Sequence, residues 1–371
     1  MIPRDPIQWK TIEVKADLLC MGVKPSEAAE KFYLKQNPER DRKTGNVGLH
    51  MIINNQTYAI VTLSHKFNES SPYSIGENDG FHLTKDGKRV AEINFITMPK
   101  WYSEKTSTGK PTSSIFLHEG THYMHMEYRG CDFFQKGNPC KFCGTGGRWS
   151  IGTPKEIAET VNMAHKEDPS YHVCLGGGTR LPLSRNTEYF LNCVKEIRKN
   201  NPGVPIFVEM TPPETNDEIK ELVDAGASCF GFNLELWDDK VRKEICTGKH
   251  VISKDRYFEA WEYAKKLLGK NKVGSCQIIG LEPMNSSIEG IEAATSRGVQ
   301  VSVMPFKPWQ GSLYEKISPC SPEDILEASK VAAKIMLKYD VDPHKNYGCF
   351  NCAGCTVAED ILKFLKQGDP I

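Results

Sequence analysis

Short apolar runs alternate with longer amphipathic stretches between about residues 120 and 340. The apolar runs predict strands over residues 122–128, 171–175, 206–210, 228–236, 276–280 and 299–306. The stretches between and after them predict helices over residues 153–166, 186–199, 216–225, 253–268, 286–297 and 322–339. Because each strand is followed by a helix, the pattern predicts an α/β fold with a parallel sheet. Six such units fit a partial (β/α)6 barrel of TIM type.

The first hundred or so residues follow another pattern. Helical periodicity over residues 12–21 and 25–36 precedes alternating segments such as YAIVTLSH and GKRVAEINFITM, with NDG and KDG turn signals. We therefore expect a small α+β region of helices and hairpins over residues 1–114, the barrel over 115–340, and a cysteine-rich segment over 341–371. The first region either shapes and closes the substrate site or only supports the barrel.

A tight cysteine triplet lies in the stretch CDFFQKGNPCKFC. Cys131, Cys140 and Cys143 (the first triplet) have the spacing C-x8-C-x2-C. Three thiolates this close suit an iron–sulfur cluster that keeps one iron without a protein ligand. Such an open iron can bind a small molecule and pass it an electron. The alternative is a zinc site or a group of buried thiols, although zinc usually takes four protein ligands.

The residues around the last cysteine make this loop resemble the radical S-adenosylmethionine (radical SAM) superfamily. Phe142 precedes that cysteine, and Gly144, Gly146 and Gly147 follow it. The usual spacing in the superfamily is C-x3-C-x2-C, so the C-x-F-C half matches and the first gap is longer here. The resemblance extends over about residues 120–340 and is closest to the biotin synthase and lipoyl synthase group.

The resemblance implies a [4Fe–4S] cluster on the first triplet that binds S-adenosylmethionine (SAM) by its amino and carboxylate groups. One electron from a reductant such as flavodoxin or ferredoxin would break the sulfonium C–S bond and give a 5′-deoxyadenosyl radical. That radical would remove a hydrogen atom from a small-molecule or carrier-bound substrate, and the protein would supply orientation and a dry pocket.

Further cofactor contacts follow from the resemblance at the ends of the predicted strands, where functional groups of such a barrel gather. Besides Phe142 they are Gly176, Gly177, Gly178 and Thr179 in LGGGTR, Glu209, Asn233 and Glu235 on the next two strands, and Ile278 and Gly280 in IIGLEP. The glycines would approach the amino end of SAM, the polar side chains its sugar and ammonium, and the last two the adenine.

These contacts have structural alternatives. The glycines could form an ordinary strand-to-helix turn. Glu209 and Glu235 could pair with Arg180 or Arg242 for stability, since a buried carboxylate needs partners.

A second triplet, Cys349, Cys352 and Cys355 in GCFNCAGC, follows the last predicted barrel helix with the iron–sulfur spacing C-x2-C-x2-C. It predicts an auxiliary [4Fe–4S] cluster, and a zinc ribbon or structural cap is the alternative. Cys246, Cys320 or His344 are candidates for a fourth ligand. In the superfamily, such clusters donate sulfur, bind substrate through an open iron, or relay electrons.

The segment HEGTH, residues 118–122, matches the H-E-x-x-H pattern of zinc proteases. We reject that reading because Gly120 and the β-branched Thr121 weaken the helix that the zinc motif needs. His122 and His125 could still line the barrel near the cluster.

Composition narrows the class of protein. With 47 basic and 47 acidic residues among 371, the chain has no net charge to attract nucleic acid or a membrane surface. The sequence does not open with a basic-then-apolar leader, and it contains no apolar run as long as a membrane span. We therefore expect a cytoplasmic protein with reduced thiols. Open clusters are oxygen-sensitive, which predicts anaerobic operation.

The fate of the substrate radical is left open by the sequence. Sulfur insertion from the auxiliary cluster, a sulfurtransferase-like reaction, is our first expectation. A rearrangement, lyase or methylation step with substrate anchored on that cluster is the second. From another class, the alternative is a two-cluster electron carrier, which is disfavoured because a carrier needs fully ligated clusters and no glycine-lined pocket.

Overall fold

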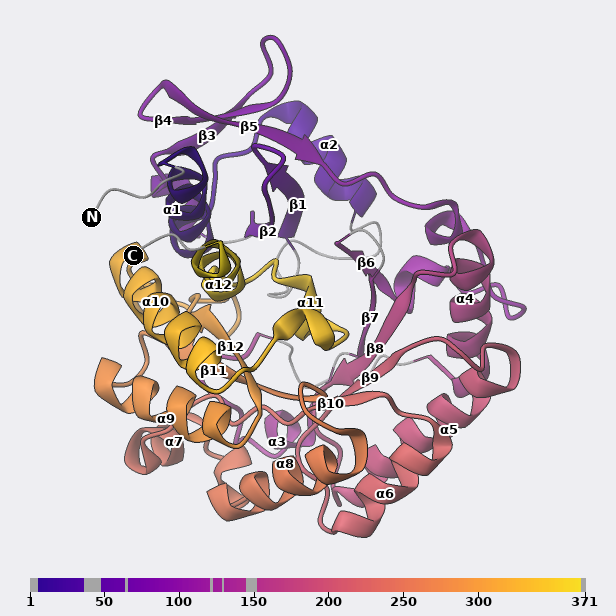
Figure 1. The fold of residues 1–371 in the computed structure, drawn as a ribbon. Helices are drawn as coiled ribbons and strands as arrows, with labels where there is room; N and C mark the ends of the chain where they lie inside the picture. The colour runs from indigo at the N-terminus through magenta and orange to yellow at the C-terminus, as the bar shows by residue number, and fades with distance from the viewer. Residues whose placement is uncertain are drawn as a thin grey trace.

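The computed structural model describes residues 6–36, 48–63, 66–120, 123–128, 130–144 and 152–367. A curled sheet inside a ring of helices forms most of the molecule, and a smaller sheet lies beside it (Figure 1). None of the helices in the described part of the chain is long and apolar enough to cross a membrane.

Among the described residues, the large sheet has seven strands in the order β12-β11-β10-β9-β8-β7-β6. Their bounds are β6 (Leu117–Glu119), β7 (Tyr123–Tyr128), β8 (His172–Gly177), β9 (Ile206–Glu209), β10 (Cys229–Gly231), β11 (Val273–Ile279) and β12 (Gln300–Pro305). Neighbours from β7 to β12 run parallel, and only β6 is antiparallel to its neighbour β7. Since β6 and β12 are the two edges, the sheet is a partial barrel, which confirms the predicted fold class.

The fourth predicted strand was too long. We expected it to run over residues 228–236, but β10 ends at Gly231. The chain then stays beside β11 until Glu235, which takes a left-handed backbone with φ 73° and therefore interrupts the extended conformation. Asn233 and Glu235 consequently lie after the strand and not within it.

The barrel helices lie on the outside of the curled sheet (Figure 1). They are α4 (Pro154–Glu167), α5 (Ser184–Asn200), α6 (Asn216–Ala225), α8 (Lys254–Leu268), α9 (Met284–Ser296) and α10 (Pro322–Lys338), as the periodicity predicts, with a short unpredicted α7 (Asp239–Ile245). Local sequence explains two of the starts. Thr153 and Thr215 each form a reciprocal capping box with the glutamate three residues later.

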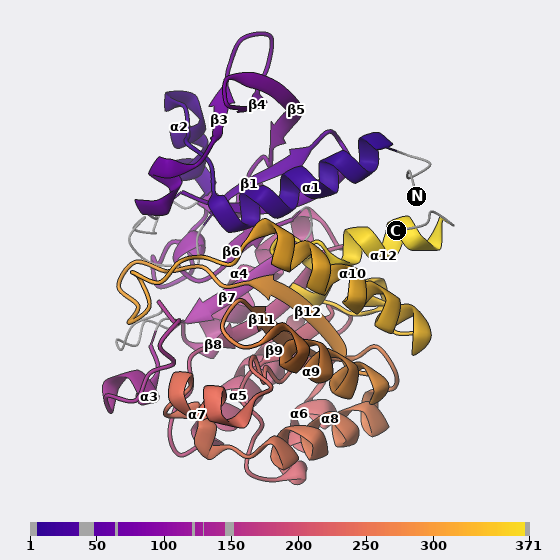
Figure 2. The same ribbon diagram turned by 90° about the vertical axis from the view of Figure 1, so that its left-hand side faces the viewer.

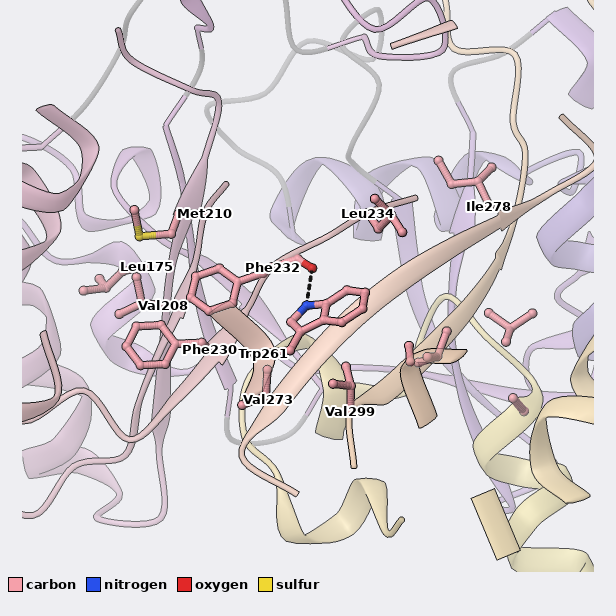
Figure 3. Close-up of a cluster of buried hydrophobic side chains, with 14 of the residues drawn as sticks. Leu175, Val208, Met210, Phe230, Phe232, Leu234, Trp261, Val273, Ile278 and Val299 are labelled. Carbon is pink, nitrogen blue, oxygen red and sulfur yellow. Dashed lines mark hydrogen bonds between the residues drawn. The ribbon is translucent and has the colours of Figure 1, made fainter. Parts of the chain in front are cut away.

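The two faces of the strands bury different side chains because successive residues alternate. Those facing the helices form the main apolar core, which includes Leu175, Val208 and Phe230 of the strands and Trp261 of α8 (Figure 3). The Trp261 indole N–H donates to the Phe232 carbonyl at 3.0 Å. The faces inside the barrel bury a smaller cluster that is rich in cysteine: Cys174, Phe207, Cys229, Cys276 and, from the C-terminal segment, Phe350.

The N-terminal α+β region consists of α1 (Pro6–Met21), α2 (Glu27–Gln36) and a five-stranded sheet in the order β2-β1-β5-β4-β3. The strands are β1 (Gly48–Ile53), β2 (Thr57–Thr62), β3 (Tyr73–Gly76), β4 (His82–Lys85) and β5 (Lys88–Phe95), paired antiparallel. Both predicted turn signals lie at hairpins, where Asp79 and Asp86 take positive φ before a glycine. The first helix starts earlier than expected, at Pro6.

The C-terminal segment contains η5 (Pro343–Lys345), α11 (Cys349–Cys352) and α12 (Ala358–Lys366). In Figure 1, α11 lies inside the ring of strands and helices. It sits at the amino-terminal ends of the strands, because the Gly348 N–H donates to His172 at the start of β8 and Gln300 at the start of β12 donates to the Phe350 carbonyl. The segment thus fills the barrel, and our division of the chain into three parts stays a proposal.

Candidate functional site

The first triplet lies in the loop that follows β7, at the carboxyl-terminal end of the barrel strands. Figure 2 shows the short helix α3 (Asp132–Gln135) of this loop and the C-terminal α12 at opposite ends of the barrel. Cys131 caps α3, and the Asp132 N–H donates to the Thr179 carbonyl at 2.8 Å. The loop after β7 is therefore tied to the loop after β8.

Backbone N–H groups surround the Cys131 thiol. The Thr179 N–H donates to Cys131 Sγ at 3.5 Å. Burial raises the pKa of Cys131, and hydrogen bonds from the N–H groups of Thr179, Phe134 and Phe133 counter that rise. N–H groups directed at sulfur stabilise a thiolate and tune a cluster that it ligates.

Gly178 lets these two loops touch. A Cβ at this position would lie 1.7 Å from the Gly130 carbonyl oxygen and 2.8 Å from Cys131 Cβ. Only glycine fits such a close backbone approach. The third glycine of LGGGTR thus has a packing role that the turn alternative did not foresee, and a contact of Gly176, Gly177, Gly178 and Thr179 with SAM stays a prediction.

The other two cysteines of the first triplet lie beside the segment after α7. Cys140 forms an isolated antiparallel bridge with Cys246, and the Lys141 N–H donates to the Ile245 carbonyl at 2.9 Å. The main cause that raises the pKa of Cys140 is a hydrogen bond with the Cys246 thiol, and the second cause is burial. The Cys143 N–H donates to the Cys140 carbonyl at 3.0 Å. Phe142 packs on the main core.

A buried ion pair adjoins Cys140. Lys249 Nζ lies 3.0 Å from Glu235 Oε1, and a Glu235 carboxylate oxygen lies within 4.8 Å of the Cys140 and Cys246 sulfurs. Burial lowers the pKa of Lys249, but the charge of Glu235 and the smaller effects of Tyr257, Cys140 and Cys246 together outweigh burial and raise the pKa. Glu235 Oε2 is buried and has no hydrogen-bond partner among the described residues. A strained, partly orphaned carboxylate of this kind is typical of a ligand site.

The partner of Glu235 is therefore Lys249, which sequence reasoning missed, and not Arg242. Arg242 donates instead to the backbone carbonyls of Lys249 and Ile252. The sequence around Lys249, directly after Cys-Thr-Gly, does not indicate an ion pair with Glu235. The pair forms only because the turn after α7 brings Lys249 back across the barrel mouth.

Glu209 and Asn233 lie together inside the barrel. Asn233 Nδ2 donates to Glu209 Oε1 at 2.6 Å, and the Cys276 N–H donates to Asn233 Oδ1 at 3.1 Å. The Cys174 thiol donates to Glu209 Oε2 at 3.8 Å. These contacts hold the Glu209 carboxylate in a fixed orientation toward the barrel interior.

Ile278 and Gly280 lie at the end of β11. The Ile278 N–H donates to the Glu235 carbonyl at 2.9 Å, so the predicted adenine segment adjoins the buried ion pair. Gly280 has φ 97° and lies against Cys320. Glu282, four residues after Ile278, accepts from the N–H groups of Trp237 and Asp238 and has a structural role.

The zinc-protease pattern is excluded where the structure describes it. His118 and Glu119 lie on strand β6, and Gly120 has φ 59°, so these residues do not form the helix that H-E-x-x-H requires. His122, like Gly146 and Gly147 of the cysteine loop, lies outside the described residues.

The second triplet lies at the opposite end of the barrel interior, on and after α11. Burial raises the pKa of Cys352, and the nearby Glu119, Cys349 and Cys355 add to the rise. Cys246 and Cys320, which we had considered as a fourth ligand here, lie beside Cys140 and Cys20 instead. His344 is exposed.

The donor sets fit the groups that the sequence implies. Soft thiolates suit iron–sulfur clusters, N–H groups directed at Cys131 suit a ligated sulfur, and the orphaned oxygen of Glu235 suits a ligand with N–H or O–H donors. The first triplet follows β7 at the carboxyl-terminal end of the strands, and Cys349 and Cys352 of the second triplet pack against the cysteine-rich cluster inside the barrel.

The chain is similar to several known proteins. Residues 128–286 match the family model described as the Radical SAM superfamily. The chain is 25% identical over 365 residues to bacteriochlorophyllide c C-7(1)-hydroxylase of Chlorobaculum limnaeum, covering 90% of this chain and 86% of that protein. It is 26% identical over 175 residues to a biotin synthase of Psychromonas ingrahamii, covering 46% of each and so less than half of that protein. A solved radical SAM methyltransferase from Sphaerobacter thermophilus is 13% identical with a TM-score of 0.46, covering 78% of this chain and 81% of that chain.

Proposed function

This chain belongs to the radical SAM superfamily, and we propose that it is an enzyme that replaces a hydrogen atom on an unactivated carbon of a small-molecule or carrier-bound substrate. When bound, a [4Fe–4S] cluster and SAM supply a 5′-deoxyadenosyl radical able to remove that hydrogen atom. The observation that carries the proposal is the first triplet at the carboxyl-terminal mouth of a partial barrel, locked to the LGGGTR turn through Gly178.

The chain's own residues would divide the work at the mouth. Cys131, Cys140 and Cys143 hold the cluster, and the N–H groups around Cys131 stabilise its sulfur. The buried oxygen of Glu235 accepts a hydrogen bond from the cofactor, and Lys249 fixes that carboxylate in place. Such preorganised contacts hold the reacting atoms in position and keep water away.

The remaining residues that we predicted to contact the cofactor lie at the carboxyl-terminal mouth of the barrel or inside the barrel next to that mouth. Phe142, the LGGGTR residues 176–179, Ile278 and Gly280 would surround the cofactor, with Glu209 and Asn233 deeper inside. The electron would come from a flavodoxin or ferredoxin. We propose a cytoplasmic, anaerobic setting, with neither nucleic acid nor membrane as partner.

Hydroxylation is the reaction that we place first. A relative that aligns along nearly the whole chain is named as a hydroxylase, whereas the biotin synthase aligns over less than half. Sulfur insertion, our first expectation from the sequence, becomes the second candidate. It is favoured by the second triplet, which we propose to hold an auxiliary [4Fe–4S] cluster that could act as a sulfur source.

Isotope labels distinguish these reactions. Anaerobic, reduced protein is incubated with SAM and a small-molecule extract of its host, once in H₂¹⁸O and once after reconstitution with ³⁴S-sulfide. Mass spectrometry then follows the compounds that are consumed and formed. We expect a product that carries ¹⁸O. The substrate radical would give up one electron to an oxidised iron–sulfur cluster, and water would then supply the hydroxyl group and release a proton. A product with ³⁴S establishes sulfur insertion, and an unlabelled isomer of the substrate excludes both reactions.

A further inference from the structure

The second triplet offers three thiols, whereas a closed [4Fe–4S] cluster takes four protein ligands. The additional ligands suggested by sequence position lie elsewhere or face solvent, as described above. The structure offers another thiol. Cys174 on β8 is fully buried, and its side chain belongs to the cysteine-rich cluster inside the barrel together with Phe350 of α11.

Cys174 lies directly against the second triplet. Its sulfur, the sulfur of Cys349 and a carboxylate oxygen of Glu209 all lie within 4.8 Å of one another. The three residues belong to β8, α11 and β9. They come together because α11 lies inside the barrel. Rotation of a cysteine about its single side-chain torsion moves the sulfur by about 3 Å. Cys174 is therefore within reach of a metal centre that Cys349 ligates.

We propose that Cys174 is the fourth thiolate of the metal centre held by the second triplet. This inference rests on the auxiliary cluster of the proposed function and names its missing ligand. Thiolate is the preferred ligand of iron–sulfur clusters, which favours Cys174 over the two carboxylates nearby, Glu209 beside Cys349 and Glu119 beside Cys352.

Glu209 has a different role at this centre. The Cys174 thiol already donates to Glu209 Oε2, and Asn233 holds the other carboxylate oxygen. A thiol loses its proton when it binds metal, so Cys174 would release one proton to solvent and bind the iron as a thiolate, with no oxidant or reductant needed. Glu209 would stay beside the bound sulfur, held by Asn233.

A fourth thiolate changes what the auxiliary cluster can do. With four cysteine ligands, none of its irons keeps a vacant position, so substrate would not be anchored there. The cluster would relay electrons or donate sulfur from the amino-terminal end of the barrel, while the open iron at the first triplet remains the place where a small molecule binds.

The test compares iron and spectra in full-length variants reconstituted anaerobically. Cys174→Ala is matched with Cys229→Ala, which removes another fully buried thiol from the same interior cluster. We expect Cys174→Ala to lose about one iron per chain and, after mild oxidation, to show the electron paramagnetic resonance signal of a three-iron cluster, because one corner has lost its ligand. Cys229→Ala should retain the iron and spectrum of the unmodified protein.

Four further variants secure the result. Cys174→Ser keeps the shape of the side chain and should retain the fourth iron with an altered spectrum, which serves if the alanine variant does not fold. Unchanged iron and spectra in both Cys174 variants would overturn the assignment, as would a change seen with Glu209→Gln or Glu119→Gln but not with Cys174. If removing all three cysteines of the second triplet leaves the iron content unaltered, the auxiliary cluster itself is refuted.

Discussion

Replacing Gly178 by alanine should separate the two loops that build the candidate radical site. The new Cβ would lie 1.7 Å from the Gly130 carbonyl oxygen, whereas real Cβ contacts essentially never fall below 3.0 Å. The backbone must therefore move by about 1.3 Å, the difference between the two distances. Neither atom belongs to a flexible side chain, so the Cys131 loop or the turn after β8 has to shift.

Overpacking of this size costs about 1–3 kcal/mol of folding stability, which a chain of this length tolerates. The effect on function should be larger, because a misplacement of about 1 Å lowers a rate by about 100-fold. We expect Gly178→Ala to stay folded by circular dichroism but to bind less iron at the first triplet and to cleave SAM about 100 times more slowly.

The matched control is Gly203→Ala, at a position where an added Cβ meets no described atom within 4 Å. Iron per chain, the charge-transfer absorbance of the cluster and 5′-deoxyadenosine formation are measured for both variants. If Gly178→Ala equals Gly203→Ala in all three, the close approach of the two loops does not matter for the site.

Three further changes test separate parts of the structure. Glu209→Ala or Asn233→Ala should weaken SAM binding roughly ten- to hundred-fold at unchanged iron content, from the loss of a hydrogen bond to a charged group. Equal affinity by calorimetry in both variants would return the two residues to a structural role. Alanines at all three cysteines of the second triplet should preserve slow 5′-deoxyadenosine formation and abolish product, and product formed at the normal rate would contradict this. Burial raises the pKa of Glu359 from 4.5 to about 7. The folded state therefore holds the proton more tightly, and stability falls as the pH rises from 4.5 through 7, by about 3 kcal/mol in total. Glu359→Gln should remove this loss, so the substitution should stabilise the protein more at pH 8 than at pH 5. Urea titrations of the variant and the unmodified protein at both pH values measure this difference.

Much of the barrel could be predicted because its signals are local. Apolar runs mark β7 to β12, and a threonine followed three residues later by glutamate marks the starts of α4 and α6. The first triplet is recognisable for the same reason, since its three cysteines lie within one short loop. The interruption at Glu235 escaped this reasoning, because a left-handed residue inside an alternating run changes no periodicity. The short helix α7 escaped it as well.

The contacts that complete the sites could not be predicted because they join distant segments. The pairs Lys249 with Glu235 and Cys246 with Cys140 depend on the turn after α7 folding back over the barrel mouth. Cys349 meets Cys174 because α11 enters the barrel, and its short sequence looked like an appendage. No periodic pattern reveals where a short segment packs once the strands have curled around it.

Cleavage of SAM by the reduced protein tests the central claim most directly. Anaerobically reconstituted protein is mixed with dithionite or reduced flavodoxin and SAM, and 5′-deoxyadenosine is measured over time. The account predicts steady formation by the unmodified protein and none by the variant with alanine at Cys131, Cys140 and Cys143. Equal amounts of 5′-deoxyadenosine from both proteins, or none from a protein that carries its cluster, would contradict it.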